Sequence, residues 1–224
     1  MNAPQRHIVH SFDDELSVIQ AQVTHMGEMV TGQLASLLEA VGKRDAATAF
    51  AVTRNESQVN AQEIKIDTQI FLVLAKRCPV ASDLRLVMAA SKIVTQLERA
   101  GDEVAKVANV LLEQLLPENV LACDDLMAAT LASGSDTLNL LRAVMRAFTD
   151  MDFAAARDLA SQSRPRAELN ASMSQIMEAM QDGPQGVKKA VGQIMIMKAI
   201  DRLNDLAYEI AKDVVFLGDE THPT

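Results

Sequence analysis

Two pairs of carboxylates with the same spacing are the residues of this sequence best suited to chemistry. Glu98 and Asp102 flank an Arg-Ala-Gly segment, and Asp201 and Asp205 flank Arg-Leu-Asn. Residues four apart lie on one face of a helix, so the negative charges of each pair repel each other. A partly desolvated pair of this kind must take up a proton, meet Arg or Lys, or bind a hard cation.

The donor atoms of these segments are oxygens, which favours Mg, Mn, Ca or Fe as the cation. Neither segment contains Cys or His, which argues against a structural zinc site. Glu209 extends the second row of acids by another turn. The competing interpretation is a solvated, charged helix surface on which Arg99 and Arg202 accompany the acids. The recurrence of the pair with an offset of 103 residues favours a duplicated unit over chance.

Helical periodicity dominates the segments that must position these acids. A stripe of apolar residues from Phe12 to Val41 predicts a long amphipathic helix, and similar patterns predict helices over about 46–76, 83–116, 126–150, 153–182 and 187–217. Breaks occur at Gly42, at Pro79, at Pro117 and at 183–186. The link before Ala46 resembles the link before Phe153, which also suggests duplication.

These elements predict an all-α protein built from two tandem, pseudo-symmetric three-helix bundles with six long antiparallel helices. The first repeat is expected over residues 12–117 and the second over 118–217. Residues 1–11 and 218–224 are expected to be flexible ends.

Composition restricts the classes of function. The formal net charge of −9 and the lack of a Lys/Arg run argue against nucleic-acid binding. The four His residues are scattered, and no nucleophile or phosphate-loop motif is present, so we expect no enzyme. Cys78 and Cys123 are isolated, and no signal peptide or membrane span is apparent, which indicates a cytoplasmic protein.

Two stretches of this sequence resemble the PhoU family of phosphate-uptake regulators. Residues 75–88 contain Pro79 followed by Asp83-Leu84-Arg85, and residues 97–102 read Leu-Glu-Arg-Ala-Gly-Asp. The family pattern is a basic residue, Pro, a small residue and Asp-Leu-Arg, followed by Glu-Arg-x-Gly-Asp. The resemblance covers nearly the whole chain.

The resemblance implies two three-helix bundles, frequent homodimers and acidic motifs that bind metal clusters in some members. Carried over to this chain, it implies Glu98, Asp102, Asp201 and Asp205 as metal ligands, with Glu56 as the best additional ligand from the stretch that also holds Asn60 and Glu63. The cation would be Mg, Mn or Fe.

The resemblance also implies a non-enzymatic repressor of the phosphate-starvation response. Its partners would be the ATPase of the phosphate ABC transporter and the phosphate sensor histidine kinase, so it would meet the membrane only through those partners. Two alternatives from the residues themselves are a metal-storage helical bundle and a metal-free helical scaffold.

The second repeat departs from the family pattern at two places. Residues 162–167 carry Pro165 between two arginines where the family commonly has Asp, and Asn204 replaces the glycine found at Gly101. The first metal site is therefore expected to be the more complete one.

Overall fold

The structure is a computed structural model that describes residues 4–115, 124–162, 177 and 180–218, and all its regular elements are helical. The long helices are α1 (Pro4–Lys43), α2 (Ala46–Arg77), α3 (Ala81–Val110), α4 (Asp124–Thr149) and α7 (Gly183–Gly218), and α5 (Phe153–Ser161) is short. A π-helical turn, η1 (Leu111–Leu115), continues α3, and a 3-10 turn, η2 (Met180–Asp182), precedes α7. The prediction of an all-α fold is confirmed.

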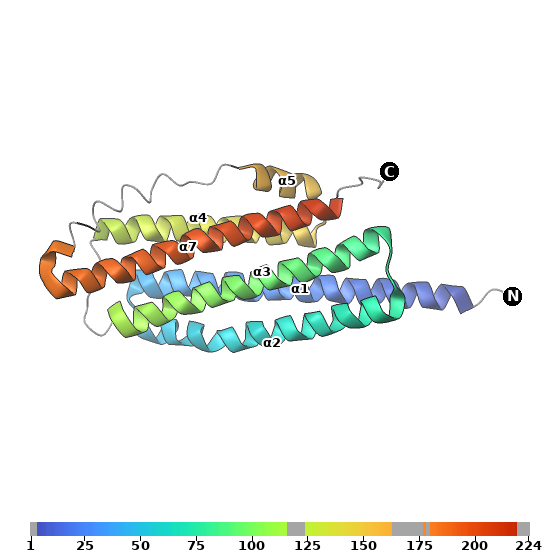
Figure 1. The fold of residues 1–224 in the computed structure, drawn as a ribbon, viewed down its shortest axis with the longest axis horizontal. Helices are drawn as coiled ribbons and strands as arrows, with labels where there is room; N and C mark the ends of the chain where they lie inside the picture. The colour runs from blue at the N-terminus through green and yellow to red at the C-terminus, as the bar shows by residue number, and fades with distance from the viewer. Residues whose placement is uncertain (1–3, 116–123, 163–176, 178–179, 219–224) are drawn as a thin grey trace.

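The helices form an elongated molecule in which α1, α2 and α3 lie on one side and α4, α5 and α7 on the other (Figure 1). The predicted stripe of α1 is buried along its length because its spacing keeps it on one face of the helix. Its members are Leu16, Ile19, Val23, Met26, Val30, Leu34, Leu37 and Val41.

The first corner of each half has the same turn. Arg44 and Met151 both adopt a left-handed backbone, with φ of 56° and 53°. The next residues, Asp45 and Asp152, donate their N–H to carbonyls five residues back and cap the following helix with their carboxylates. The same short turn chemistry therefore reverses the chain at corresponding places.

One hydrophobic core runs through both halves. Buried side chains of α1, α2, α3, α4, α5 and α7 belong to a single cluster. The bundles meet where α1 packs on α4 and where α3 packs on α7, and α3 and α7 run side by side in Figure 1. The two repeats expected from the sequence therefore share a core, which their separate periodicities did not predict.

Two ion pairs show how α3 is aligned against α7. Lys92 lies 3.7 Å from Asp213, and Arg202 lies 3.4 Å from Glu103. The residue numbers rise along α3 as they fall along α7, so the two helices are antiparallel. The ammonium of Lys92 also lies 5.2 Å from the centre of the Phe216 ring.

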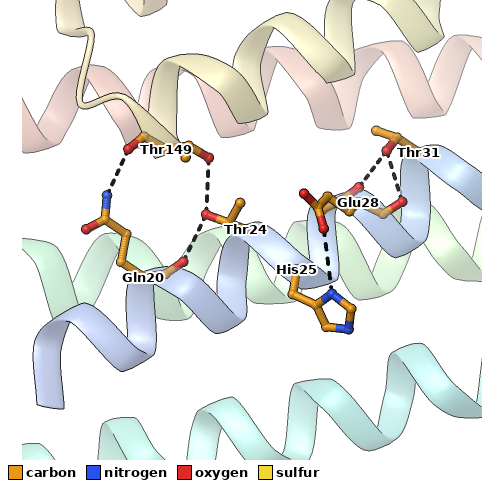
Figure 2. A network of polar contacts seen from close by, with 7 residues as sticks. Gln20, Thr24, His25, Glu28, Thr31 and Thr149 are labelled. Atoms are coloured by element: carbon orange, nitrogen blue, oxygen red, sulfur yellow. Dashed lines mark hydrogen bonds and ion pairs between the residues drawn. The ribbon is translucent and has the colours of Figure 1, made fainter. Parts of the chain in front are cut away.

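Polar contacts attach α1 to the end of α4 (Figure 2). The Gln20 amide donates to the carbonyl oxygens of Thr149 at 3.2 Å and Phe148 at 3.5 Å, and the hydroxyls of Thr24 and Thr149 lie 3.1 Å apart. The last carbonyls of a helix lack partners within that helix. Gln20 supplies partners to two of them and connects the first half to the second corner.

Several predicted helix limits were wrong. Helix α1 begins at Pro4, within the segment expected to be a flexible end, and α7 begins at Gly183 rather than near 187. Proline is compatible with a first helical turn because that turn needs no N–H donor, and Pro184 lies in such a turn. Helix α3 gives way to the π-helical turn at Leu111.

The predicted helix over 153–182 was also wrong, since α5 ends at Ser161 and Gln162 is extended, with ψ of 139°. Pro165, which follows shortly, has no N–H to continue a helix. Residues 163–176 lie outside the described part of the chain, as do 219–224 of the expected tail.

Candidate functional site

A glycine positions the first acidic motif against its neighbouring helix. Gly101 is buried, and a Cβ added there would lie 3.2 Å from Cγ1 of Val59 on α2 and 3.7 Å from Oε1 of Gln33 on α1. This separation is tighter than ordinary van der Waals contact. The absence of a side chain at position 101 thus lets α3 approach α2 closely, between Glu98 and Asp102.

We expect Gly101→Leu to lower the free energy of unfolding by about 3 kcal/mol, because the new side chain overpacks the α2–α3 contact. Gly32 on α1 provides the matched control, since a Cβ there meets nothing within 4 Å. Gly32→Leu should instead stabilise by up to about 1 kcal/mol through helix propensity. Urea denaturation of both variants measures the difference, and equal effects would contradict the packing role of Gly101.

The acids of the first motif lie at the edge of the buried face, as the helical wheel predicts. Glu98 and Asp102 are both half-buried. Burial raises the pKa of Glu98 above its ordinary value, and the charge of Asp102 adds to the rise. The positive charges of Arg99 and Lys106 oppose it, and Glu56 on α2 contributes a smaller rise.

Helix α2 contributes a second acid to this face. Burial raises the pKa of Glu63, and the charges of Glu98, Asp67 and Asp102 raise it further. The charges of both motif acids therefore raise the pKa of Glu63. Glu56, the additional ligand favoured from the sequence, has the smallest of the effects on the pKa of Glu98. We call Glu56, Glu63, Glu98 and Asp102 the acidic face.

Neutral oxygens lie beside the acidic face. Oδ1 of Asn60 on α2 and Oε1 of Gln33 on α1 are buried and accept no hydrogen bond among the described residues. Gln33 is only 5% exposed. Sequence reasoning missed Gln33, although its position between Val30 and Leu37 of the apolar stripe marks it as a polar residue in a core position.

The acidic face is not a formed metal centre in this conformation. Within the described ranges, no three His, Cys, Asp or Glu side chains converge in an arrangement that could hold a metal ion. Carboxylate and amide oxygens are the donors that hard cations prefer, so the chemistry of the residues fits such an ion. Binding would require the acid side chains to rotate toward one another.

The second acidic motif has different surroundings. Asp201 is exposed and Asp205 is half-buried. The motif's arginine, Arg202, lies against Glu103 of α3 and so joins the two halves. Asn204, which replaces the motif glycine, has a buried Oδ1 that accepts no hydrogen bond from the residues described. Arg164, Pro165 and Arg166, at which the second repeat departs from the family pattern, lie outside the described residues.

No described helix has both the length and the apolarity needed to cross a membrane. A pocket of about 290 Å³ lies between α1 and α2. It is lined by Asp14, Glu15, Val18, Gln69, Leu72, Val73 and Lys76. Its Glu15 is held by Arg77 at 2.8 Å, which fixes the corner before α3 to α1.

Comparison with known proteins identifies relatives along nearly the whole chain. The PhoU domain family matches residues 23–111. A Burkholderia sp protein described as a phosphate-specific transport system accessory protein PhoU homolog is 31% identical, over 95% of this chain and 90% of the relative. The Escherichia coli K12 accessory protein PhoU is 30% identical, over 94% of this chain and 86% of its own length.

Solved structures show the same architecture. The crystal structure of PhoU from Pseudomonas aeruginosa superposes with a TM-score of 0.86 at 28% identity, covering 94% of this chain and 100% of that one. The phosphate transport system regulatory protein PhoU from Streptococcus pneumoniae gives a TM-score of 0.78 at 24% identity, covering 93% and 97%. The latter likeness concerns the fold alone.

Proposed function

The chain belongs to the PhoU family of regulatory accessory proteins of the phosphate-specific transport system, which are not enzymes, and we propose that it represses the phosphate-starvation response. It would do so in the cytoplasm by coupling the ATPase of the phosphate ABC transporter to the sensor histidine kinase. The observation that supports the proposal is similarity over 95% of the chain to a relative named as an accessory protein of that system.

The described surface suits such a coupling role. Helices such as α2 and α3 are 32 and 30 residues long and present extended surfaces, so separate partners can contact one chain at separate places. With a net charge of −9, the protein is suited to partners with basic surfaces. We propose that it reaches the membrane only through those partners.

A deletion strain tests the regulatory proposal. A phosphate-response promoter fused to a reporter should become active in high phosphate when the gene is deleted, and the intact chain supplied in trans should silence it again. A pull-down of the ATPase and of the kinase sensor domain by the purified chain, with and without chelator, then tests the coupling. A promoter that stays silent in the deletion strain, with unchanged phosphate uptake, would contradict repression.

We further propose that the acidic face binds a hard divalent cation or iron, with Glu98, Asp102 and Glu56 as ligands and Glu63 beside them. The buried, unpartnered oxygens of Asn60 and Gln33 support this proposal because they leave acceptor capacity next to the acids. The proposal includes Asp201 and Asp205 as a second, weaker site.

Added Mn²⁺ should therefore raise the melting temperature of the chain. A ligand present at one hundred times its Kd stabilises the folded state by about 2.7 kcal/mol, which corresponds to roughly 6–10 °C at most for a chain of this size. Thermal melts of metal-stripped protein with and without MnCl₂ measure the shift.

The variant Glu98→Gln/Asp102→Asn should lose this shift, because its amides carry no charge to attract the ion. The matched variant Asp201→Asn/Asp205→Asn should keep most of it. A shift that survives the first variant unchanged would place the cation elsewhere, and no shift in wild type would remove the metal proposal.

A further inference from the structure

All four basic residues of α3 stand seven positions apart. They are Arg85, Lys92, Arg99 and Lys106, and we call them the basic ladder. Seven residues fall about 20° short of two helical turns, so the four side chains lie within about 60° on a helical wheel and span about 32 Å. The last three are exposed and Arg85 is half-buried. The ladder is therefore a line of positive charge along the side of α3 that faces solvent.

The acids that accompany the basic ladder lie beneath its cations. Lys92 is 3.7 Å from Asp213 of α7, and Lys106 is 3.1 Å from Glu103. The side chains of both acids are only 15% exposed, whereas those of Lys92 and Lys106 are 54% and 62% exposed. The charge that an approaching molecule meets on this line is therefore positive, in a chain whose net charge is −9.

The two arginines of the ladder keep donor capacity for a partner. Nε of Arg85 is buried and donates no hydrogen bond among the described residues. Arg99 forms no ion pair in the described part of the chain, and its charge acts on Glu98 only by lowering the pKa of that acid. A guanidinium presents five N–H donors in a planar fork that matches a carboxylate.

Exposed apolar side chains accompany one end of the ladder. Met88 lies one helical turn from both Arg85 and Lys92 and is 43% exposed. Leu84, one turn before Met88, is 39% exposed. The ring of Phe216 on α7 is 40% exposed and lies 5.2 Å from the ammonium of Lys92. Cations and apolar groups therefore form one mixed surface where α3 and α7 run side by side (Figure 1).

We propose that the basic ladder docks a helix of a partner protein, and that this helix carries carboxylates at the same seven-residue spacing with apolar residues at one end. Two helices packed side by side both repeat after about 10.5 Å, so each cation of the ladder meets one acid. The apolar end of the partner helix covers Met88 and Phe216. This proposal goes beyond the regulatory function proposed above and does not depend on it.

The charges of the whole chain favour an acidic helix over a nucleic acid. The phosphates of a nucleic-acid strand recur about every 3.4 Å along the axis and gain nothing from a spacing of two helical turns. A long polyanion would also extend beyond the single line of cations and meet a chain of charge −9. A short acidic helix avoids this repulsion because it can lie on the ladder alone.

Binding of a designed peptide tests the proposal. The probe is a fluorescein-labelled helical peptide with glutamate at every seventh position and leucines beside the glutamates of one end. The comparison peptide has the same composition with glutamate at every fifth position. Fluorescence anisotropy is measured with chelator present, because a divalent cation would otherwise bridge the peptide to the acidic face. The full chain should bind the first peptide at least about fivefold more tightly than the second.

The variant Arg85→Gln/Arg99→Gln should weaken binding of the first peptide by about tenfold, because it removes two charge pairs. The matched control is Arg54→Gln/Lys65→Gln, which removes two exposed cations of α2 and gives the same net charge. It should change binding by less than about twofold. Arg99→Glu alone, at an exposed position, should also weaken binding by about tenfold, and circular dichroism checks that each variant is folded.

The apolar end of the ladder has its own test. Met88→Ala should weaken binding by about threefold at both 0.05 and about 0.2 M salt, since an apolar contact is not screened. Binding through the arginines should instead weaken as the salt concentration rises.

Four outcomes would overturn the proposal. They are no binding of the first peptide, equal binding of the two peptides, equal losses in the arginine variant and its α2 control, and unchanged binding by Arg99→Glu. A fifth would assign the ladder to nucleic acid instead. It is tighter binding of a single-stranded oligonucleotide of equal charge, lost in Arg85→Gln/Arg99→Gln and unaffected by Met88→Ala. None of these measurements involves the transporter or the kinase.

Discussion

Replacing Phe148 with alanine is expected to lower the free energy of unfolding by about 3–5 kcal/mol, the largest loss we expect from a single truncation in this chain. Phe148 is 0% exposed and is among the largest fully buried side chains. It lies in the last turn of α4, where Gln20 of α1 bonds its carbonyl. The truncation would leave a cavity where the two halves meet.

The loss should extend to the first half, because one core cluster runs through all six α-helices described. Chemical denaturation followed by circular dichroism should show a single transition moved to lower denaturant. Hydrogen exchange should show that α2 loses protection together with α4. Phe216→Ala, at a side chain 40% exposed, is the control and should cost less than half as much. Loss of protection confined to α4 would contradict a shared core.

Replacing Lys92 with methionine is expected to lower stability at pH 7 by about 1–3 kcal/mol, because it removes the cation facing a largely buried carboxylate. The side chain of Asp213 is 15% exposed and lies 3.7 Å from Lys92. Burial raises the pKa of Asp213 above its ordinary value, and Lys92 opposes the rise. On the same helix, Glu209 raises this pKa and Lys212 lowers it.

The sign of the pH dependence follows from the raised pKa. A carboxyl whose pKa is higher in the folded state favours folding when protonated, and this contribution is lost as the pH rises through the folded-state pKa. Lys92→Met should raise the pKa of Asp213 further. The variant should therefore recover stability relative to wild type as the pH falls from 7 toward the ordinary pKa of Asp.

Denaturation curves between pH 4 and 8 measure this recovery. The double variant Lys92→Met/Asp213→Asn should regain most of the loss at pH 7, because no buried charge remains. Lys212→Met is the control, since Lys212 has the weakest of the effects on the pKa of Asp213. A loss independent of pH would assign the role of Lys92 to its contact with the Phe216 ring instead.

Much of the local structure was predictable because the buried face and the caps of a helix depend on residues that are close together in the sequence. The apolar stripe of α1 gave its buried face, and Asp45 indicated the start of α2 through its capping chemistry. The spacing of Glu98 and Asp102 placed both acids at the edge of the core. The metal ligands themselves, including Asp201 and Asp205, remain predictions.

Other features were missed because they depend on distant segments. The pKa of Glu63 is raised by burial and by acids that include Glu98 and Asp102 of α3, and the burial of Gln33 depends on how closely α3 approaches α1 at Gly101. The end of α5 at Ser161 was missed because the apolar pattern continued beyond it. The basic ladder was also missed, since only the packed bundle shows which side of α3 stays exposed.

The paired acid-Arg-x-x-Asp segments illustrate the difference between what the sequence determines and what the tertiary structure determines. The sequence by itself determined that each pair lies on one face of a helix, since that follows from helical spacing alone. Only the tertiary structure decided that the two pairs have different surroundings. Gly101 lets α2 pack closely beside the first pair, whereas the arginine of the second motif, Arg202, lies against Glu103 of α3. Helical period is a property of a few residues, whereas the choice of neighbour depends on the packing of the whole core.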